Sequence, residues 1–353
     1  MTKKIAVIFF NLGGPDSLES VKPFLFNLFN DKAITQLLQP FRFLLATLIS
    51  NRRNKTAQKI YSFIGNKSPV LKNTKKQASD IETYLNVSHD FTFKTFITMR
   101  YWHPMSHETV LKVQEYHPDE IILVPLYPHW STTTSESSVK DWEKACRKIK
   151  LKKPTKLICC YPTNEGFIKQ NITLIKEEYK KAKKYGKPRV LFSAHGLPER
   201  IIKQGDPYQY QCVLTANKIV EELKIKNLDW KNTYQSQVGP LKWIGPQTDD
   251  EIILASKDNV PLIIVPIAFV SEHSETLVEL DIEYKALAKQ NNCPYYGRVS
   301  TVSDKPYFIK GLSNLIFKTV QQNRLITSDI EHQKCRCDLK KCALRCNIEG
   351  VHF

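Results

Sequence analysis

A single histidine stands where a side chain could do proton chemistry. His195 lies between the small residues Ala194 and Gly196, directly after the apolar run 190–192. Its ring is therefore expected on a rigid element with open space beside it. A neutral imidazole in that position can accept a proton near pH 7. The alternative is a structural histidine whose nitrogens are satisfied inside the core.

Three carboxylates recur at intervals of four residues further along the chain. Glu275, Glu279 and Glu283 share one face if this segment is helical. A solvated acidic stripe is the alternative. The segment begins beside His273, however, and neighbouring like charges raise one another's pKa and so favour proton exchange. We therefore interpret the row as a path for protons or metal ions.

The elements that must position these residues alternate between two patterns. Short apolar runs predict strands and longer segments of helical period predict amphipathic helices. The expected strands are 5–10, 91–98, 121–126, 156–160, 190–192 and 262–270, and the expected helices are 139–149, 167–184, 208–223, 275–290 and 307–321. This alternation predicts an α/β fold of two doubly wound parallel-sheet domains. We expect domains at 1–163 and 164–325, with a tail at 326–353.

Unusual polar and aromatic segments directly follow five of these strands. They are 11–15, 100–104, 127–131, 193–196 and 271–275. Parallel sheets bind ligands outside the carboxyl ends of their strands. We therefore expect these segments to converge on one cleft between the two domains, rich in aromatic residues, histidine and glutamate.

Composition and motifs disfavour several classes of protein. The Gly-Gly-Pro sequence at 13–15 lacks the third glycine of a dinucleotide fingerprint, and the chain contains no P-loop. The net charge of +17 is dispersed and accompanied by no zinc finger or RNP sequence, so nucleic acid is disfavoured as a partner. The first residues lead into a strand without a signal-peptide pattern, which predicts a cytoplasmic protein.

Two long motifs resemble those of a known family. The sequence 191–198 (LFSAHGLP) is similar to the ferrochelatase signature, and 266–284 is similar to the second hallmark of that family. Further matches lie at 11–15, 100–104, 127–128 and 235–248. Together these matches extend from about residue 5 to residue 320. This chain differs from the family pattern in the loop 65–69 and at Gln237.

This resemblance implies two Rossmann-like domains with a porphyrin cleft between them. The implied activity is that of a lyase that inserts Fe²⁺ into protoporphyrin IX, in the last step of haem biosynthesis. His195, Glu275 and Glu279 would be catalytic, and His195 and Glu275 would contact the iron substrate. The implied porphyrin-binding residues are Leu12, Tyr61, Ser68, Arg100, Tyr101, Tyr127, Trp243 and His273.

Two other activities remain open from the sequence. A relative that acts on coproporphyrin would share the same motifs, and a non-catalytic porphyrin or metal carrier would need the cleft walls without the base. The apolar segment 41–49 suits a lip for protoporphyrin or a peripheral contact with the inner face of a membrane. It also suits a helix packed on the core.

The tail carries four of the nine cysteines of the chain: Cys335, Cys337, Cys342 and Cys346. In a cytosolic protein such a group points to metal or free thiols before disulfides. Some ferrochelatases carry a [2Fe–2S] cluster on a tail of this kind, and four thiolates are the number that such a cluster requires. Zinc and exposed reduced thiols are the alternatives.

Overall fold

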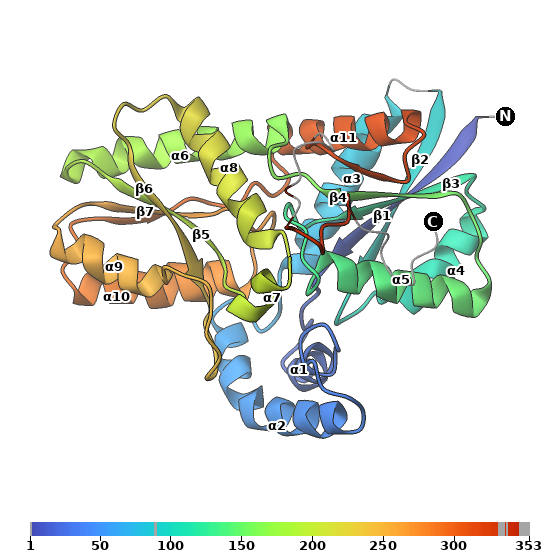
Figure 1. Ribbon diagram of the computed structural model, residues 1–353, viewed down its shortest axis with the longest axis horizontal. Coiled ribbons are helices and arrows are strands. Elements are labelled where there is room, and N and C mark those ends of the chain that lie inside the picture. The colour runs from blue at the N-terminus through green and yellow to red at the C-terminus, as the bar shows by residue number, and fades with distance from the viewer. Residues whose placement is uncertain (1, 88–89, 331–335, 337, 346–353) are drawn as a thin grey trace. The chain divides into compact units, whose positions relative to one another are not determined.

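We describe the protein from a computed structural model, which describes residues 2–87, 90–330, 336 and 338–345. The chain forms two compact units (Figure 1). Unit 1 comprises Met1–Cys160, Ser313–Ser328 and Ala343–Phe353, and unit 2 comprises Tyr161–Leu312 and Asp329–Cys342. The last strand and residues 313–321 of the last helix thus group with unit 1, whereas the sequence placed 313–325 in the second domain and 326–353 in a separate tail.

Unit 1 is built on a parallel sheet of five strands in the order β2-β1-β3-β4-β9. The strands are β1 (Lys3–Asn11), β2 (Phe91–Met99), β3 (Glu120–Pro125), β4 (Thr155–Cys160) and β9 (Ile326–Ser328). The central strands β1 and β3 are apolar along almost their whole length, because helices cover both faces. In Figure 1, α3 (Val70–Asn86) and α11 (Pro306–Gln321) lie on one face, and α4 (Ser106–Tyr116) and α5 (Ser135–Ile149) on the other.

A pair of helices is inserted between β1 and α3. The helices α1 (Val21–Phe29) and α2 (Phe41–Ser62) pack on each other, with the rings of Phe26 and Phe43 5.2 Å apart. Only Ala46, Ser50 and Tyr61 of α2 are buried. Within the apolar segment 41–49 only Ala46 is buried, and the large side chains Phe41, Phe43, Leu44 and Leu48 are exposed, unlike those of a helix packed on a core.

Unit 2 contains a parallel sheet of four strands in the order β6-β5-β7-β8. The strands are β5 (Arg189–His195), β6 (Asp229–Gln235), β7 (Leu262–Pro266) and β8 (Tyr296–Arg298). The helices α6 (Glu165–Ala182) and α8 (Tyr208–Leu223) lie on one face, and α9 (Thr248–Lys257) and α10 (Lys285–Gln290) on the other (Figure 1). The short helices η1 (Lys183–Tyr185) and α7 (Glu199–Lys203) complete the unit.

The helix that carries the carboxylate row has an unusual form. The sequence predicted one α-helix over 275–290, but the structure has a π-helix, η2 (Glu275–Tyr284), followed by α10. A π-helix closes its hydrogen bonds from residue i to i+5 and is wider than an α-helix. The chain is therefore helical over the whole predicted range, but four-residue spacing alone could not distinguish an α-helix from a π-helix.

The predicted class of fold is confirmed, since both units are parallel sheets covered by helices. Each expected strand is present, although the one expected at 262–270 ends at Pro266. The expectations did not include β6, β8 and β9, which are edge strands and are either polar or only three residues long. Among the residues that the structure describes, no helix is both long enough and apolar enough to cross a membrane.

Candidate active site

The end of β5 places His195 at the carboxyl edge of the sheet of unit 2. The strand is buried up to Ala194, and the side chain of His195 is 37% exposed. Next in the chain is Gly196, where a Cβ atom would come within 3.0 Å of the ring of Trp243. Glycine thus permits Trp243 to lie close to the histidine, with 6.2 Å between the two ring centroids.

The carboxylate of Glu275 determines which tautomer of His195 is present. Nδ1 of His195 lies 2.9 Å from Oε2 of Glu275. An ionised carboxylate can only accept, so Nδ1–H donates the hydrogen bond. In the neutral ring the lone pair is then on Nε2, which becomes the atom able to accept a proton.

The same contact changes the pKa of both groups. Burial opposes protonation of His195, but the charge of Glu275, its hydrogen bond and the charge of Glu279 outweigh burial and raise the pKa of the histidine. Burial would raise the pKa of Glu275, yet the neighbouring His195 and His273 hold it far below its usual range. Glu275 is therefore ionised throughout the physiological range.

A second carboxylate, on the same wide helix, has the opposite tendency. Burial and the charge of Glu275 raise the pKa of Glu279. Three donors hold this group: Gln235 Nε2 at 3.0 Å, Ser236 Oγ at 2.6 Å and Tyr284 OH at 3.2 Å. Two carboxylates whose pKa values are pushed apart can divide the roles of fixed charge and proton acceptor.

A buried chain of hydroxyls orients the amide that holds Glu279. Ser193 Oγ donates to Oε1 of Gln235 at 2.8 Å, so the NH₂ group of that amide must face the carboxylate. Ser193 also lies 2.9 Å from the hydroxyl of Thr248, which donates to Thr233 at 2.9 Å. Glu279 is thus positioned by the core of unit 2.

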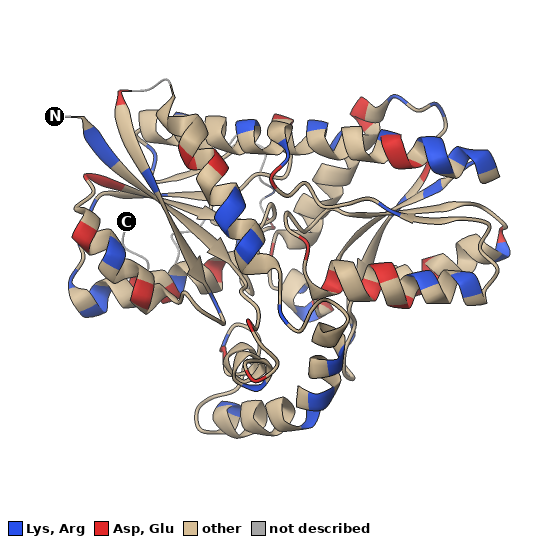
Figure 2. Ribbon diagram, turned by 180° about the vertical axis from the view of Figure 1, so that it is seen from behind, with Lys and Arg blue, Asp and Glu red and all other residues tan. Residues whose placement is uncertain are grey.

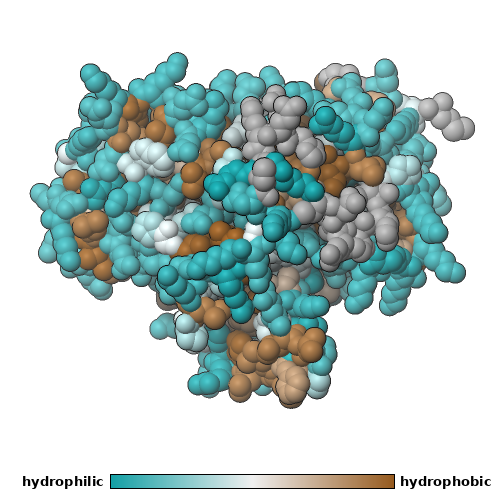
Figure 3. All heavy atoms as spheres, viewed as in Figure 1, coloured by the Kyte–Doolittle hydropathy of each residue, from teal (hydrophilic) through white to brown (hydrophobic). Residues whose placement is uncertain are grey.

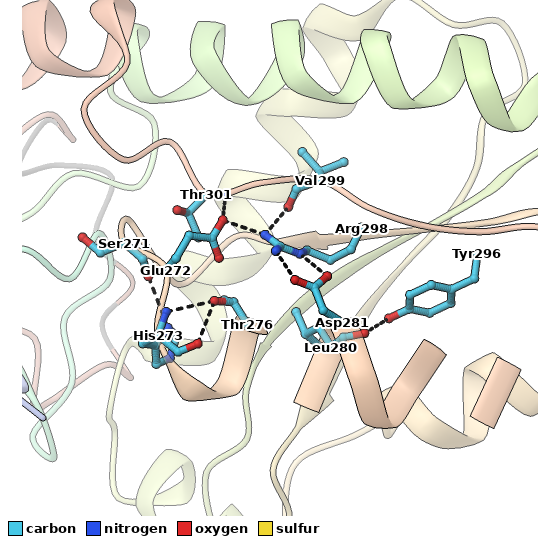
Figure 4. Close-up of polar contacts among 10 residues, drawn as sticks. All are labelled: Ser271, Glu272, His273, Thr276, Leu280, Asp281, Tyr296, Arg298, Val299 and Thr301. Carbon is cyan, nitrogen blue, oxygen red and sulfur yellow. Dashed lines mark hydrogen bonds and ion pairs between the residues drawn. The ribbon is translucent and has the colours of Figure 1, made fainter. Parts of the chain in front are cut away.

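His273 lies near the same carboxylate oxygen of Glu275 as His195 does. Its Nδ1 is 3.2 Å from the carbonyl oxygen of Ser271, and its backbone N–H donates to Oγ1 of Thr276 at 3.0 Å (Figure 4). Since a carbonyl only accepts, Nδ1 carries the hydrogen, and Nε2 faces Glu275 at 3.8 Å. The predicted residues His195, Trp243, His273, Glu275 and Glu279 therefore lie together in unit 2.

Unit 1 contains a second group of predicted residues, organised around Arg100. Its Nη2 donates to Oδ2 of Asp31 at 2.8 Å, and the same oxygen accepts from the hydroxyl of Tyr101 at 2.7 Å and from Ser137 at 2.5 Å. The guanidinium also lies over the ring of Tyr101, 5.0 Å from its centroid. Tyr101 has no exposed surface, so in this structure its role is to pack against the guanidinium of Arg100.

The other predicted residues of unit 1 are located near this group. The carbonyl of Leu12 accepts from the backbone N–H of Tyr101 at 3.0 Å, and Tyr61 packs in the same apolar cluster as Tyr101. Burial raises the pKa of the Tyr127 hydroxyl, against the opposing charge of Arg100. Ser68 holds the loop at Pro15 through a backbone hydrogen bond of 2.7 Å.

Several residues with clear roles in these groups were not predicted as site residues. Asp31, Gln235, Ser236 and Tyr284 each hold a predicted side chain in place. The motif comparison included the last three without giving them a role, and nothing in the sequence marked Asp31. Glu283, the third residue of the carboxylate row, is exposed.

Of the four tail cysteines, Cys335, Cys337 and Cys346 lie outside the described residues. Cys342 is described and is buried, next to the buried residues Ala343 and Leu344. Within the part of the chain that the structure describes, no group of three or more histidine, cysteine or acidic side chains is arranged to hold a metal ion.

Comparison with known proteins identifies the class of this chain. A family model of ferrochelatases matches residues 4–320. Ferrochelatases from Wolbachia sp. subsp. Drosophila simulans (strain wRi) and from Rickettsia prowazekii (strain Madrid E) are 55% and 49% identical to it. The first alignment covers 88% of this chain and 98% of the relative, and the second covers 99% of each.

Solved structures of low sequence identity share the fold. SirB from Bacillus subtilis with Fe³⁺ aligns with a TM-score of 0.54 at 11% identity, over 90% of this chain and 95% of that one. The sirohydrochlorin chelatase SirB from Bacillus subtilis subspecies spizizenii, in complex with cobalt, gives 0.51 at 12% identity, over 91% and 97%. The fold is therefore that of the chelatases. More narrowly, the chain belongs to the ferrochelatase family.

Proposed function

We propose that this protein inserts Fe²⁺ into a porphyrin in haem biosynthesis, with His195 as the base. The observation that carries the proposal is the array of His195, Glu275 and Glu279 at the end of the sheet of unit 2, in a chain of this family. Metal insertion releases two pyrrole protons from a hindered centre, so the site needs an acceptor and an outlet for them.

The two carboxylates divide this work. Nε2 of His195 accepts a proton from a pyrrole nitrogen, and Glu275 stabilises the imidazolium that forms, as its short contact with Nδ1 allows. Glu275 is itself a poor proton store because its pKa is so low. Glu279, whose pKa is raised, takes up the proton next and releases it to water. Iron meets His195 and Glu275 as the incoming substrate.

The proposed porphyrin contacts comprise residues from both units. In unit 2, Trp243 and His273 flank His195 and Glu275, and an aromatic wall of this kind can grip a flat macrocycle. In unit 1, the proposed contacts are Leu12, Tyr61, Ser68, Arg100 and Tyr127, and the fully buried Tyr101 supports Arg100 instead of contacting the porphyrin.

For the porphyrin itself we propose protoporphyrin IX. The support comes from the start of α2 and the residues just before it, where Leu38, Phe41 and Leu44 are 72%, 67% and 61% exposed. Figure 3 shows the apolar surface over this helix. Such a surface suits a lipophilic substrate better than coproporphyrin III, which carries four carboxylates.

The same surface supports a peripheral contact with a cytoplasmic membrane face. Basic side chains, among them Arg52, Arg53 and Lys59, lie on the second half of α2, which Figure 2 shows in blue, and they would attract anionic headgroups. Wild-type protein should co-sediment with phosphatidylglycerol vesicles, and Phe41→Asp with Leu44→Asp should abolish this binding. Equal binding by both proteins would contradict the contact.

For the tail we propose a [2Fe–2S] cluster on Cys335, Cys337, Cys342 and Cys346. The support is the number of thiols and the burial of Cys342, which would shield a cluster from solvent. Protein purified without oxygen should be brown and contain about two irons and two sulfides per chain. Colourless protein without acid-labile sulfide would remove the cluster from the proposal.

One experiment tests the activity. Purified protein is mixed with Fe²⁺ without oxygen, with protoporphyrin IX and coproporphyrin III in parallel, and metal insertion is followed by the change in absorbance. Faster insertion into protoporphyrin IX is expected. Binding of both porphyrins without turnover would favour a carrier, and the opposite preference would identify a coproporphyrin enzyme.

A further inference from the structure

The wide helix η2 sets the directions of both carboxylates of the site. A π-helix rarely exceeds a single turn, yet this one extends over ten residues, Glu275–Tyr284. If one wide turn relaxed to an α-turn, the later residues would shift by one position, which is about 100° around the helix axis. Glu279 would then rotate away from its donors. Some interaction must hold the wide form.

One side chain contacts both the entrance and the later half of this helix. Arg298, at the end of β8, donates from Nη1 to Oε1 of Glu272 at 2.6 Å. Its Nε donates to Oδ1 of Asp281 at 2.8 Å, and its Nη2 to Oδ2 of the same carboxylate (Figure 4). Glu272 precedes Glu275 by three residues, and Asp281 follows Glu279 by two, so the guanidinium spans the catalytic segment.

Neighbours of Arg298 in the chain add two further contacts. The hydroxyl of Tyr296 donates to the carbonyl of Leu280 at 2.7 Å, and the backbone N–H of Thr301 donates to Oε1 of Glu272 at 2.9 Å (Figure 4). The strand β8 and the loop after it therefore hold the helix at its entrance and again five to six residues into it.

The geometry requires an arginine. The side chain of Arg298 is only 10% exposed, and it bonds one carboxylate with two nitrogens and a second carboxylate with the third. The guanidinium group is rigid and planar and presents its N–H donors in fixed directions, whereas a lysine offers a single point charge. Burial alone would raise the pKa of Glu272, but the charge of Arg298, together with the hydrogen bonds to this carboxyl, outweighs burial and its pKa is lowered.

We infer that Arg298 is a positioning residue: by joining Glu272 to Asp281 it keeps η2 in its wide form and so holds Glu275 against His195. This inference rests on the proposed function, which assigns the chemistry to Glu275 and His195. The hydrogen bonds of Arg298 go to Glu272, Asp281 and the carbonyl of Val299, so it acts on the catalytic groups through the helix.

The chain contains a matched control. Arg189 also bridges two carboxylates, Asp229 at 2.9 Å and Asp258 at 2.8 Å, and its side chain is 13% exposed. It belongs to unit 2 as well, but it lies at the first residue of β5, the end of the strand opposite His195. Loss of either arginine should therefore cost similar stability, and only loss of Arg298 should disturb the site.

The experiment compares Arg298→Lys and Arg298→Met with Arg189→Lys and Arg189→Met. The measurements are the thermal midpoint, quenching of porphyrin fluorescence, the turnover number for iron insertion, and the pKa of His195 from an NMR titration. Both Arg298 variants should lose about 10- to 100-fold in turnover, the expected range for a small displacement of catalytic groups, while porphyrin binding is retained. The pKa of His195 should fall, because Glu275 is no longer held beside it.

The Arg189 variants should show neither change. The inference would be overturned if the Arg298 variants and the Arg189 variants changed turnover and the pKa of His195 equally. Full turnover by Arg298→Lys would also overturn it. If Arg298→Met does not fold, Arg298→Lys and Asp281→Asn decide the matter. Absence of turnover in the wild-type protein would instead refute the proposed function, and the NMR comparison would still test Arg298.

Discussion

Replacing Glu275 by glutamine tests whether the contact with His195 is catalytic. The substitution keeps the size of the side chain but removes the charge 2.9 Å from Nδ1 of the histidine. Glu283→Gln is the matched control, since Glu283 belongs to the same helix and is exposed. If the carboxylate row is only a solvated stripe, the two variants should behave alike.

The expected loss follows from this hydrogen bond. A bond to a charged group contributes about 1.5–3 kcal/mol. Since about 1.4 kcal/mol corresponds to a factor of ten in rate, Glu275→Gln should reduce turnover by about 10- to 150-fold. Glu283→Gln should stay within about twofold, because exposed substitutions rarely exceed about 0.5 kcal/mol.

The pH dependence of turnover is an independent test, because the direction of its shift in Glu275→Gln can be predicted. The base must be neutral, so turnover falls as the pH drops through the pKa of His195. Glu275 raises that pKa, and its replacement should therefore move the acidic limb of the profile to lower pH. Turnover is measured from pH 5 to 9 with Fe²⁺ and protoporphyrin IX without oxygen. Equal, mild losses in the two variants, or an unmoved limb in Glu275→Gln, would refute the reasoning.

Three further substitutions probe the site and the fold. His195→Ala should reduce turnover by about 10²- to 10⁴-fold while porphyrin fluorescence is still quenched, and near-normal turnover would make it a structural residue. Asp31→Asn leaves the buried charge of Arg100 without its main partner and should cost about 3 kcal/mol in urea unfolding, whereas an unchanged midpoint would show that the pair is dispensable. Gly166→Ala would place a Cβ atom 2.1 Å from the carbonyl oxygen of Tyr307, where α6 packs against α11, so it should lower the thermal midpoint. A midpoint equal to that of the wild-type protein would mean that these two helices can move apart without loss of stability.

The sequence predicted the interior strands and the edge strand β2, but it missed the edge strands β6, β8 and β9, for a physical reason. Strands β1, β3 and β7 are covered on both faces, so they appear as continuous apolar runs. Strand β6 has the polar sequence DWKNTYQ and lies at the edge of its sheet beside β5. Only its last three residues are buried, so it shows no apolar run. Spacing likewise could not reveal a π-helix.

The candidate site divides in a similar way. His195 and Glu275 could be proposed from their positions after strands, a local feature of the chain. The residues that hold the site act over long separations: Asp31 lies 69 residues from Arg100, and Gln235 lies 44 residues from Glu279. Such pairs are created by the tertiary fold, so the sequence alone does not show which residues are paired.

The return of the chain to unit 1 has a consequence for its biosynthesis. The strand β9 pairs with β4, and Ser328 contacts Cys160 although the two lie 168 positions apart in the sequence. A ribosome that adds about 5–20 residues per second needs roughly 10–30 s to supply that strand after β4 has emerged. Through this interval the edge of β4 lacks its partner and exposes unpaired backbone groups, which are a template for aggregation. Nascent chains stalled before residue 326 should therefore depend on chaperones more than the finished protein does.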